Sequence, residues 1–245
     1  MRYCARVEYD GTDFRGFQSQ PNGRSVQSEL ETALRQLAGG GRIRVDAAGR
    51  TDSGVHAQGQ VIAFSFPRGR SVASLARSLD ALLPRDIAVS GLERAASDFS
   101  PRREARSREY RYSIWNGPRS PLRERYALGV REPLDITAMT ETARILVGRH
   151  DFSAFGGGHL QPVRTVRSIT VRKHGRLVTI DVLGDAFLRQ MVRSIVAALL
   201  RVGHGQAGTE EVALALASKG RAFAGAVAPP EGLSLRRVEL TTTKE

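Results

Sequence analysis

The sequence predicts an α+β protein built from two subdomains with a similar order of elements. Segments in which apolar and polar residues alternate, as in half-buried strands, are interspersed with amphipathic helical segments along the 245 residues. This order starts again after an arginine-rich stretch near residue 105. We therefore predict subdomains at residues 1–105 and 106–245, with a binding site in the cleft between them.

In the first half, alternation with a period of two predicts strands over 2–9, 43–48, 60–66 and 86–94. Helices are predicted over 25–40 and 71–84. Ser25 is the expected N-cap of the first helix, which ends at a pair of glycines, and a proline ends the second.

In the second half, residues 99–117 lead into a strand on which Tyr110, Tyr112 and Ile114 share one face. The segment 165–184 reads as a hairpin that turns at His174 and Gly175, and a last strand is expected over 233–240. Helices are predicted over 136–148, 185–203 and 209–220.

The chain is strongly basic, with a formal net charge of +12, and 34 of its 37 basic side chains are arginines. A guanidinium grips phosphate with two parallel hydrogen bonds and stacks on bases. Genomic base composition accounts for a preference of arginine over lysine, but not for the net charge. The charge therefore predicts a nucleic-acid partner.

Other features narrow the class of protein. The apolar runs are too short to cross a bilayer, and the N-terminus lacks the apolar region of a signal peptide, so we expect a cytoplasmic protein without a membrane span. Cys4 is the single cysteine, and the five histidines lack metal-ligand spacing. Neither a P-loop nor a GxGxxG motif occurs, so we expect no metal and no nucleotide cofactor.

The most polar motif is AAGRTDSGVHAQGQV, residues 47–61, in which Gly49 and Gly54 bracket a tight loop. Asp52 in this loop has two interpretations. It caps a turn or pairs with Arg50, or Arg50 keeps it ionised for work as a nucleophile or general base. His56 is expected to brace the backbone. Isomerisation of uridine, which needs neither metal nor cofactor, is compatible with this composition but is not identified by it.

The motif resembles the GRTDxGVHA signature of TruA-type tRNA pseudouridine synthases, and the resemblance extends along nearly the whole chain. Five further segments match that family in the same order, with Phe17 in place of its usual tryptophan. They are YDGTDFRGFQ, LPRDIAVSGLERAASDFSPR, EYRYSIWN, DAFLRQMVRSIVA and APPEGLSL.

The resemblance implies the α/β pseudouridine synthase fold, with two ferredoxin-like subdomains whose antiparallel sheets meet at a central cleft. It also implies that Asp52 is the catalytic residue, which attacks C1′ or C6 or abstracts a ribose proton. Arg50 is then expected to hold the extruded base and the phosphates, and Tyr110 to lie against the uracil. Arg193, one turn from Arg189 on the predicted helix 185–203, is expected to pair with Asp52.

The implied substrate is the anticodon stem-loop of tRNA, at positions 38, 39 and 40, bound by a homodimer. The segment 102–131 is the expected RNA groove, and its candidate RNA-binding residues are Arg102, Arg103, Arg106 and Arg108. Two alternatives stay open: an RNA-binding module without catalysis, and a synthase that acts on another RNA or on other tRNA positions.

Overall fold

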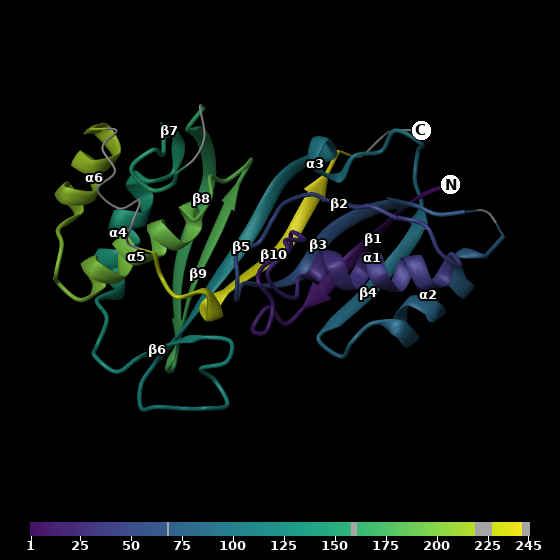
Figure 1. The fold of residues 1–245 in the computed structure, drawn as a ribbon. Helices are drawn as coiled ribbons and strands as arrows, with labels where there is room; N and C mark the ends of the chain where they lie inside the picture. Colours follow the sequence, from purple (N-terminus) through teal and green to yellow (C-terminus); the bar gives the residue numbers. More distant parts are fainter. Residues whose placement is uncertain (68, 158–160, 219–226, 242–245) are drawn as a thin grey trace. The chain divides into compact units, whose positions relative to one another are not determined.

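The computed structural model describes all residues except 68, 158–160, 219–226 and 242–245. The chain forms two compact units, residues 1–106 with 235–245, and residues 107–234 (Figure 1). The predicted second subdomain, 106–245, thus differs from the second unit at its C-terminal end. The reason is that the last strand, β10 (Leu233–Leu240), lies beside β3 of the first unit.

The first unit is organised around β1 (Arg2–Tyr9), which pairs antiparallel with β3 (His56–Ser65) on one side and β4 (Ile87–Arg94) on the other. A short strand, β2 (Val45–Ala47), also pairs with β3. All four predicted strands are confirmed. β3 begins four residues earlier than predicted, at His56 within the polar motif.

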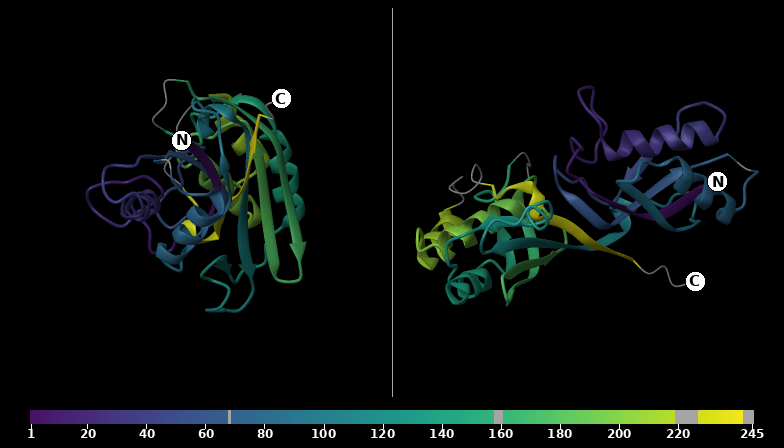
Figure 2. Two further views of the ribbon diagram at one scale, coloured as in Figure 1. Left: turned by 90° about the vertical axis from the view of Figure 1, so that its right-hand side faces the viewer. Right: turned by 90° about the horizontal axis from the view of Figure 1, so that it is seen from below.

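Helices α1 (Val26–Leu37) and α2 (Val72–Leu82) pack side by side against this sheet (Figure 2). Ser25 is the N-cap of α1, as predicted, and forms a capping box with Ser28. A single helical turn, α3 (Pro101–Glu104), was not predicted; proline at its first position fits the start of a helix.

In the second unit, β9 (Leu177–Gly184) pairs antiparallel with β5 (Ala105–Asn116) and with β8 (Val163–His174). The predicted hairpin is confirmed, and Gly175 adopts a positive φ of 58° in its turn. Tyr110, Tyr112 and Ile114 are all buried, as their shared face predicted.

Two strands of the second unit were not predicted. β6 (Leu128–Val130) pairs in parallel with β5, and β7 (Gly148–Asp151) pairs with β8. Strands of three and four residues are too short to show a period in sequence, because they form only where a partner strand supplies hydrogen bonds.

Helices α4 (Ile136–Ile145) and α5 (Met191–Gly203) pack against each other in the second unit, and α4 also contacts β8. The second unit also contains α6 (Thr209–Ser218) and a turn of 3₁₀ helix, η1 (Pro230–Gly232). The predicted end of α6 at residues 219–220 lies outside the described residues. Within the described parts of the chain, no helix is both long and apolar enough to cross a membrane.

The predicted helix 185–203 is wrong in its first turn and a half, since α5 begins at Met191. Gln190 has a φ of 63°, the left-handed conformation, which ends any helix running through it. Arg189 instead forms an isolated β-bridge with Gly157. The prediction that Arg189 and Arg193 lie one turn apart on a helix is therefore wrong as well.

We expect Ser25→Ala to lower the free energy of unfolding by about 1 kcal/mol, because an N-cap hydroxyl is lost. Ser25 is fully buried and accepts a hydrogen bond from the backbone N–H of Ser28 at 3.1 Å. Denaturant unfolding measures the change. Thr32→Ala, on an exposed position of α1, is the control; equal stability of the two variants would contradict the role of the cap.

Candidate active site

Residues 48–55 of the polar motif form a loop that ends in a tight turn, between β2 and β3 of the first unit. The backbone N–H of Val55 donates to the carbonyl of Asp52 at 3.2 Å, and Gly54 has a φ of 78° at the third position of the turn. Such turns favour glycine at that position. Asp52, half-buried, stands at the first position of this turn, and Arg50 is exposed two residues before it.

Two glycines from the segment 10–17 lie against the backbone of this loop. A Cβ atom on Gly11 would come within 2.1 Å of the carbonyl oxygen of Val55, and one on Gly16 within 2.8 Å of the carbonyl oxygen of Thr51. Gly16 also has a φ of 93°. Only glycine permits this approach, so the two segments fit together backbone to backbone.

Thr51 anchors the loop from the residue before Asp52. Its hydroxyl shares a hydrogen bond of 2.7 Å with the hydroxyl of Tyr9, in a buried position at the end of β1. Its carbonyl accepts a hydrogen bond of 3.1 Å from the backbone N–H of Phe17. Thr51 is 7 % exposed, and these contacts fix the path of the backbone into Asp52.

Phe14 holds the other end of the loop. Its carbonyl accepts hydrogen bonds of 3.2 Å from the backbone N–H of Gly54 and from the hydroxyl of Ser53. The Arg24 guanidinium lies 4.3 Å from the centre of the Phe14 ring and donates two hydrogen bonds to the carboxylate of Asp86. The bonds to Asp86 raise the pKa of Arg24, so this guanidinium is a permanent cation behind Phe14.

Two polar side chains of β3 complete the support. His56 is 6 % exposed, and its Nδ1 accepts a hydrogen bond of 2.9 Å from the backbone N–H of Gly11. This is the backbone-bracing role that the sequence predicted for His56. Gln60 is fully buried and donates from Nε2 to the carbonyl of Gly49 at 2.9 Å. The start of the loop is therefore held from the same strand that follows it.

Tyr110 lies on β5 of the second unit. It is 9 % exposed, and its ring meets that of Phe187 edge to face, with 5.3 Å between ring centres. Edge-to-face contact is a favourable arrangement for aromatic rings. Packing in the second unit is therefore one function of this ring, and the contact with uracil that the family resemblance implies stays a prediction.

Arg193 lies in the first turn of α5 in the second unit. Its Nε donates to the carbonyl of Ala228 at 2.7 Å, and the backbone N–H of Ala228 donates back to the carbonyl of Arg193 at 3.1 Å. A cation in the first turn is repelled by the positive end of the helix dipole. Helix stability therefore does not explain an arginine at this position.

The four candidate RNA-binding arginines divide between the units. Arg102, Arg103 and Arg106 belong to the first unit, where Arg102 and Arg103 are exposed on α3. Arg106 donates from Nε to the hydroxyl of Thr241 at 3.2 Å. Arg108, in the second unit, donates to the carbonyl of Asp185 at 2.6 Å and is half-buried. Arg108 thus supports the segment before α5, which the sequence did not predict.

The loop presents a carboxylate whose backbone is fixed on both sides by residues of the same unit. Such a group can attack an electrophilic carbon or accept a proton without first reorganising the chain. No three histidine, cysteine, aspartate or glutamate side chains gather as a metal site within the residues that the structure describes. The structure places Arg50 and Asp52 in one loop, whereas Tyr110 and Arg193 belong to the second unit.

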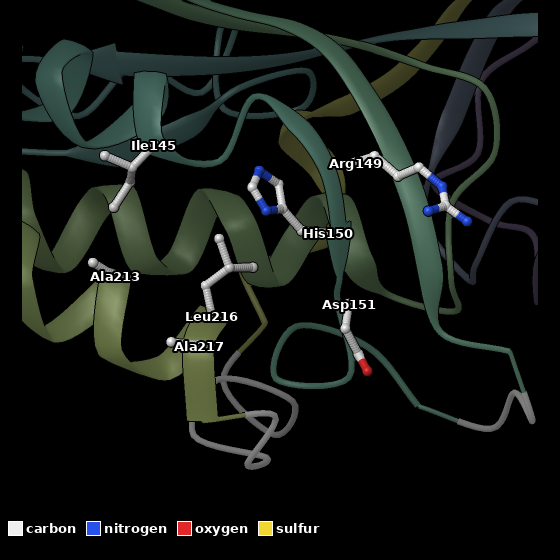
Figure 3. Close-up of a pocket in the computed structure, with 7 residues that line it drawn as sticks. All are labelled: Ile145, Arg149, His150, Asp151, Ala213, Leu216 and Ala217. Atoms are coloured by element: carbon white, nitrogen blue, oxygen red, sulfur yellow. The ribbon is translucent and has the colours of Figure 1, made fainter.

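A cavity of about 400 Å³ lies in the second unit among α4, β7 and α6 (Figure 3). The side chain of Arg149 points away from the others, and His150 Nε2 lies 3.0 Å from the carbonyl of Val147. None of the predicted site residues lines this cavity. Its lining consists of Ile145, Arg149, His150, Asp151, Ala213, Leu216 and Ala217.

Sequence reasoning missed the residues that hold the loop, although it quoted the segments that contain them. Gly11 and Phe14 lie in YDGTDFRGFQ, and Gln60 lies in the polar motif itself. The role of Gly11 and Phe14 depends on contacts with residues about 40 positions away in the sequence, and that of Gln60 on a contact 11 residues away. The sequence did contain one signal of this contact, because Gly11 and Gly16 lie close together just after the predicted end of a strand.

Comparison with known proteins gives consistent matches. The sequence profile of a family described as tRNA pseudouridine synthase matches residues 5–101 and 142–239. The chain is 44 % identical over 236 residues to a protein of Pelobacter propionicus named tRNA pseudouridine synthase A, with 95 % of this chain and 96 % of that protein covered. It is 46 % identical to the protein of the same name from Myxococcus xanthus, covering 95 % and 89 %.

A solved structure, of an H/ACA RNP bound to a substrate RNA containing 2′-deoxyuridine, matches with a TM-score of 0.36 and 13 % identity. That match covers 98 % of this chain and 58 % of the other.

We expect Gly11→Ala to destabilise the first unit by roughly 1–3 kcal/mol or more, the usual range for overpacking, because its Cβ would overlap the carbonyl of Val55. Thermal unfolding measures the loss. The control is Gly49→Ala in the polar motif, where a Cβ meets no atom within 4 Å. If both variants unfold at the same temperature, the close approach of Gly11 does not constrain the loop.

We expect Cys4 to be chemically inert and dispensable. Burial, with a hydrogen bond to Glu93 and the charge of that carboxylate, raises the pKa of the Cys4 thiol to about 11, so about one thiol in a thousand is ionised at pH 8. Mass spectrometry should find no iodoacetamide adduct on the folded protein and a full adduct after denaturation in urea. Cys4→Ala should retain its catalytic rate; rapid alkylation with loss of activity would refute this.

Proposed function

The chain belongs to the tRNA pseudouridine synthase family, and we propose on that basis that Asp52 is its catalytic residue. The chain isomerises uridine to pseudouridine in tRNA. In this reaction the N1–C1′ bond breaks, the uracil turns over, and a C5–C1′ bond forms. The proton of C5 is lost and N1 gains one, so the product is an isomer of the substrate and no electrons are transferred.

The single observation that carries the assignment of Asp52 is the anchoring of its loop. Thr51 before it and Ser53 and Gly54 after it each have a partner in the segment 10–17 or on β1. Asp52 itself is half-buried at the start of the turn. A carboxylate held in this way can form a bond to C1′ or C6 of the nucleotide, or remove a proton from the ribose.

We further propose Arg50, Tyr110 and Arg193 as substrate-binding residues. The exposed Arg50 can reach phosphates and an extruded base. The ring of Tyr110 is a flat aromatic surface of the kind on which proteins stack uracil. Arg193 donates a hydrogen bond to the carbonyl of Ala228, and its positive charge, in a helix turn where the dipole disfavours a cation, can also pair with a carboxylate.

We propose that the uridines modified are those at positions 38, 39 and 40 in the anticodon arm of tRNA, because the motifs of this chain resemble those of TruA-type enzymes. Extruding a base from a stem costs a few kcal/mol. Phosphate contacts from arginines and stacking, which is worth about 1–3 kcal/mol per base, offset that cost. We propose that the enzyme works as a homodimer, as the same resemblance implies, and that it works in the cytoplasm. The arginine-rich segment 102–131 supplies the proposed RNA-binding residues Arg102, Arg103, Arg106 and Arg108.

We expect Asp52→Asn to abolish pseudouridine formation while tRNA affinity stays within about two-fold of wild type, because the change removes a charge from the reacting centre and keeps the size of the side chain. Unmodified tRNA transcripts are incubated with each protein, and pseudouridine is mapped by position. Asp13→Asn, an exposed carboxylate in the adjoining segment, is the control and should keep full activity.

Two results would contradict the proposal. If affinity falls in step with activity, Asp52 contributes to binding or folding rather than to chemistry. If wild-type protein binds tRNA tightly and forms no pseudouridine at any position, the chain is an RNA-binding module that has kept the fold.

A further inference from the structure

An arginine-rich loop in the second unit, residues 117–127, exposes large apolar side chains to solvent. It joins β5 to β6 and projects below the strands in Figure 1. Leu122 is 91 % exposed and Tyr126 is 52 % exposed, among the most exposed large apolar residues described. Arg119, Arg123 and Arg125 are exposed in the same loop. We call residues 117–127 the basic loop.

The basic loop has a defined shape. At its base, the backbone N–H of Gly117 donates to the carbonyl of Val130 at 2.9 Å, and the side-chain amide of Asn116 donates to the same carbonyl at 3.1 Å. In the middle, the carbonyl of Ser120 accepts hydrogen bonds of 2.9 Å from the backbone N–H groups of residues 123 and 124. A ligand that binds a preformed loop does not have to order it first.

Glu124, the acidic residue of the basic loop, stabilises this conformation. The Glu124 carboxylate accepts a hydrogen bond of 2.8 Å from the backbone N–H of Ser120. The three arginines carry three positive charges against this one negative charge. The loop therefore presents net positive charge to solvent.

Two of these arginines lie beside aromatic rings. The guanidinium of Arg123 lies 5.5 Å from the centre of the Trp115 ring, and that of Arg125 lies 5.9 Å from the centre of the Tyr126 ring. The indole N–H of Trp115 donates to the carbonyl of Pro118 at 2.8 Å. Flat aromatic and guanidinium surfaces side by side are the groups on which proteins stack unpaired bases.

The turn of the β8–β9 hairpin adds further positive charge at the same end of the second unit. The backbone N–H of Asn116 donates to the carbonyl of Arg176 at 2.7 Å, and the side chain of Arg176 lies against Gly117. Lys173 and Arg176 are both exposed. Arg176 therefore brings a positive charge of the hairpin turn next to the base of the basic loop.

We infer that the basic loop, which lies within the segment 102–131 expected as the RNA groove, is an RNA-contact surface in addition to Arg102, Arg103, Arg106 and Arg108 and outside the residues proposed for catalysis. Its arginines bind phosphates, and Tyr126 stacks on an unpaired base. A polyanion with flat bases satisfies both the charge and the exposed rings, whereas a protein partner would need acidic groups around an apolar centre. That this RNA is the tRNA substrate rests on the proposed function.

The test is the affinity of Arg119→Gln/Arg123→Gln/Arg125→Gln for a fluorescently labelled, unmodified tRNA transcript between 50 and 200 mM salt. Each lost phosphate contact lowers the slope of log affinity against log salt by about one, so a fall of roughly two to three is expected. Thermal unfolding of each variant confirms that it is folded.

A matched control removes three exposed arginines of the first unit, Arg35, Arg42 and Arg77, by the same change to glutamine. It lowers the net charge by the same amount. We expect it to reduce the salt slope by less than one. Equal losses in the two triple variants would show that net charge alone is responsible and would overturn the proposal.

Stacking is tested separately from charge. We expect Tyr126→Leu to weaken tRNA binding roughly five-fold or more with the salt slope unchanged, and Tyr126→Phe to bind as wild type does. Unchanged affinity in both Tyr126→Leu and the loop triple variant would overturn the proposal. A change in sedimentation of these variants without loss of tRNA affinity would overturn it in favour of a protein contact.

These readouts are independent of catalysis. Absence of pseudouridine formation by wild-type protein would refute the proposed function and leave the binding comparison intact. Unaltered binding in the loop variants of an active enzyme would refute the second contact surface alone.

Discussion

The backbone contact between Gly11 and the carbonyl of Val55 is the constraint on which the candidate active site depends. At 2.1 Å from that oxygen there is no room for a Cβ atom, so the segment after β1 and the loop before β3 can meet only through glycine. Gly16 repeats the arrangement against Thr51. The backbone position of Asp52 therefore follows from where two stretches of backbone touch.

This arrangement separates support from chemistry. The side chains that fix the loop, those of Tyr9, Thr51, His56 and Gln60, lie in the interior and bind backbone or one another. Asp52 and Arg50 are left at or near the surface. A reacting group held by rigid elements keeps its geometry while a flexible polymer such as RNA is bound, which is the arrangement that catalysis by positioning requires.

The large positive charge is likewise divided between two functions. Arg24, Arg108, Arg111 and Arg193 each bind an oxygen of the protein, and Arg111 makes two hydrogen bonds with the carboxylate of Asp181. In the basic loop, Arg123 and Arg125 lie beside aromatic rings at the surface. Net charge alone therefore overstates the number of cations that face a nucleic acid, and the contacts of each guanidinium decide its function.

The sequence by itself determined the strands and helices that carry a strong period, the N-cap Ser25, the hairpin, the family and the loop that holds Asp52. These features are local, or are carried by motifs in a fixed order. Tertiary structure alone decided the rest: strands β6 and β7, the start of α5 at Met191, the place of β10 in the first unit, and the role of Gly11. Each of these depends on a partner distant in sequence, or on the left-handed backbone of Gln190, neither of which hydrophobic periodicity encodes.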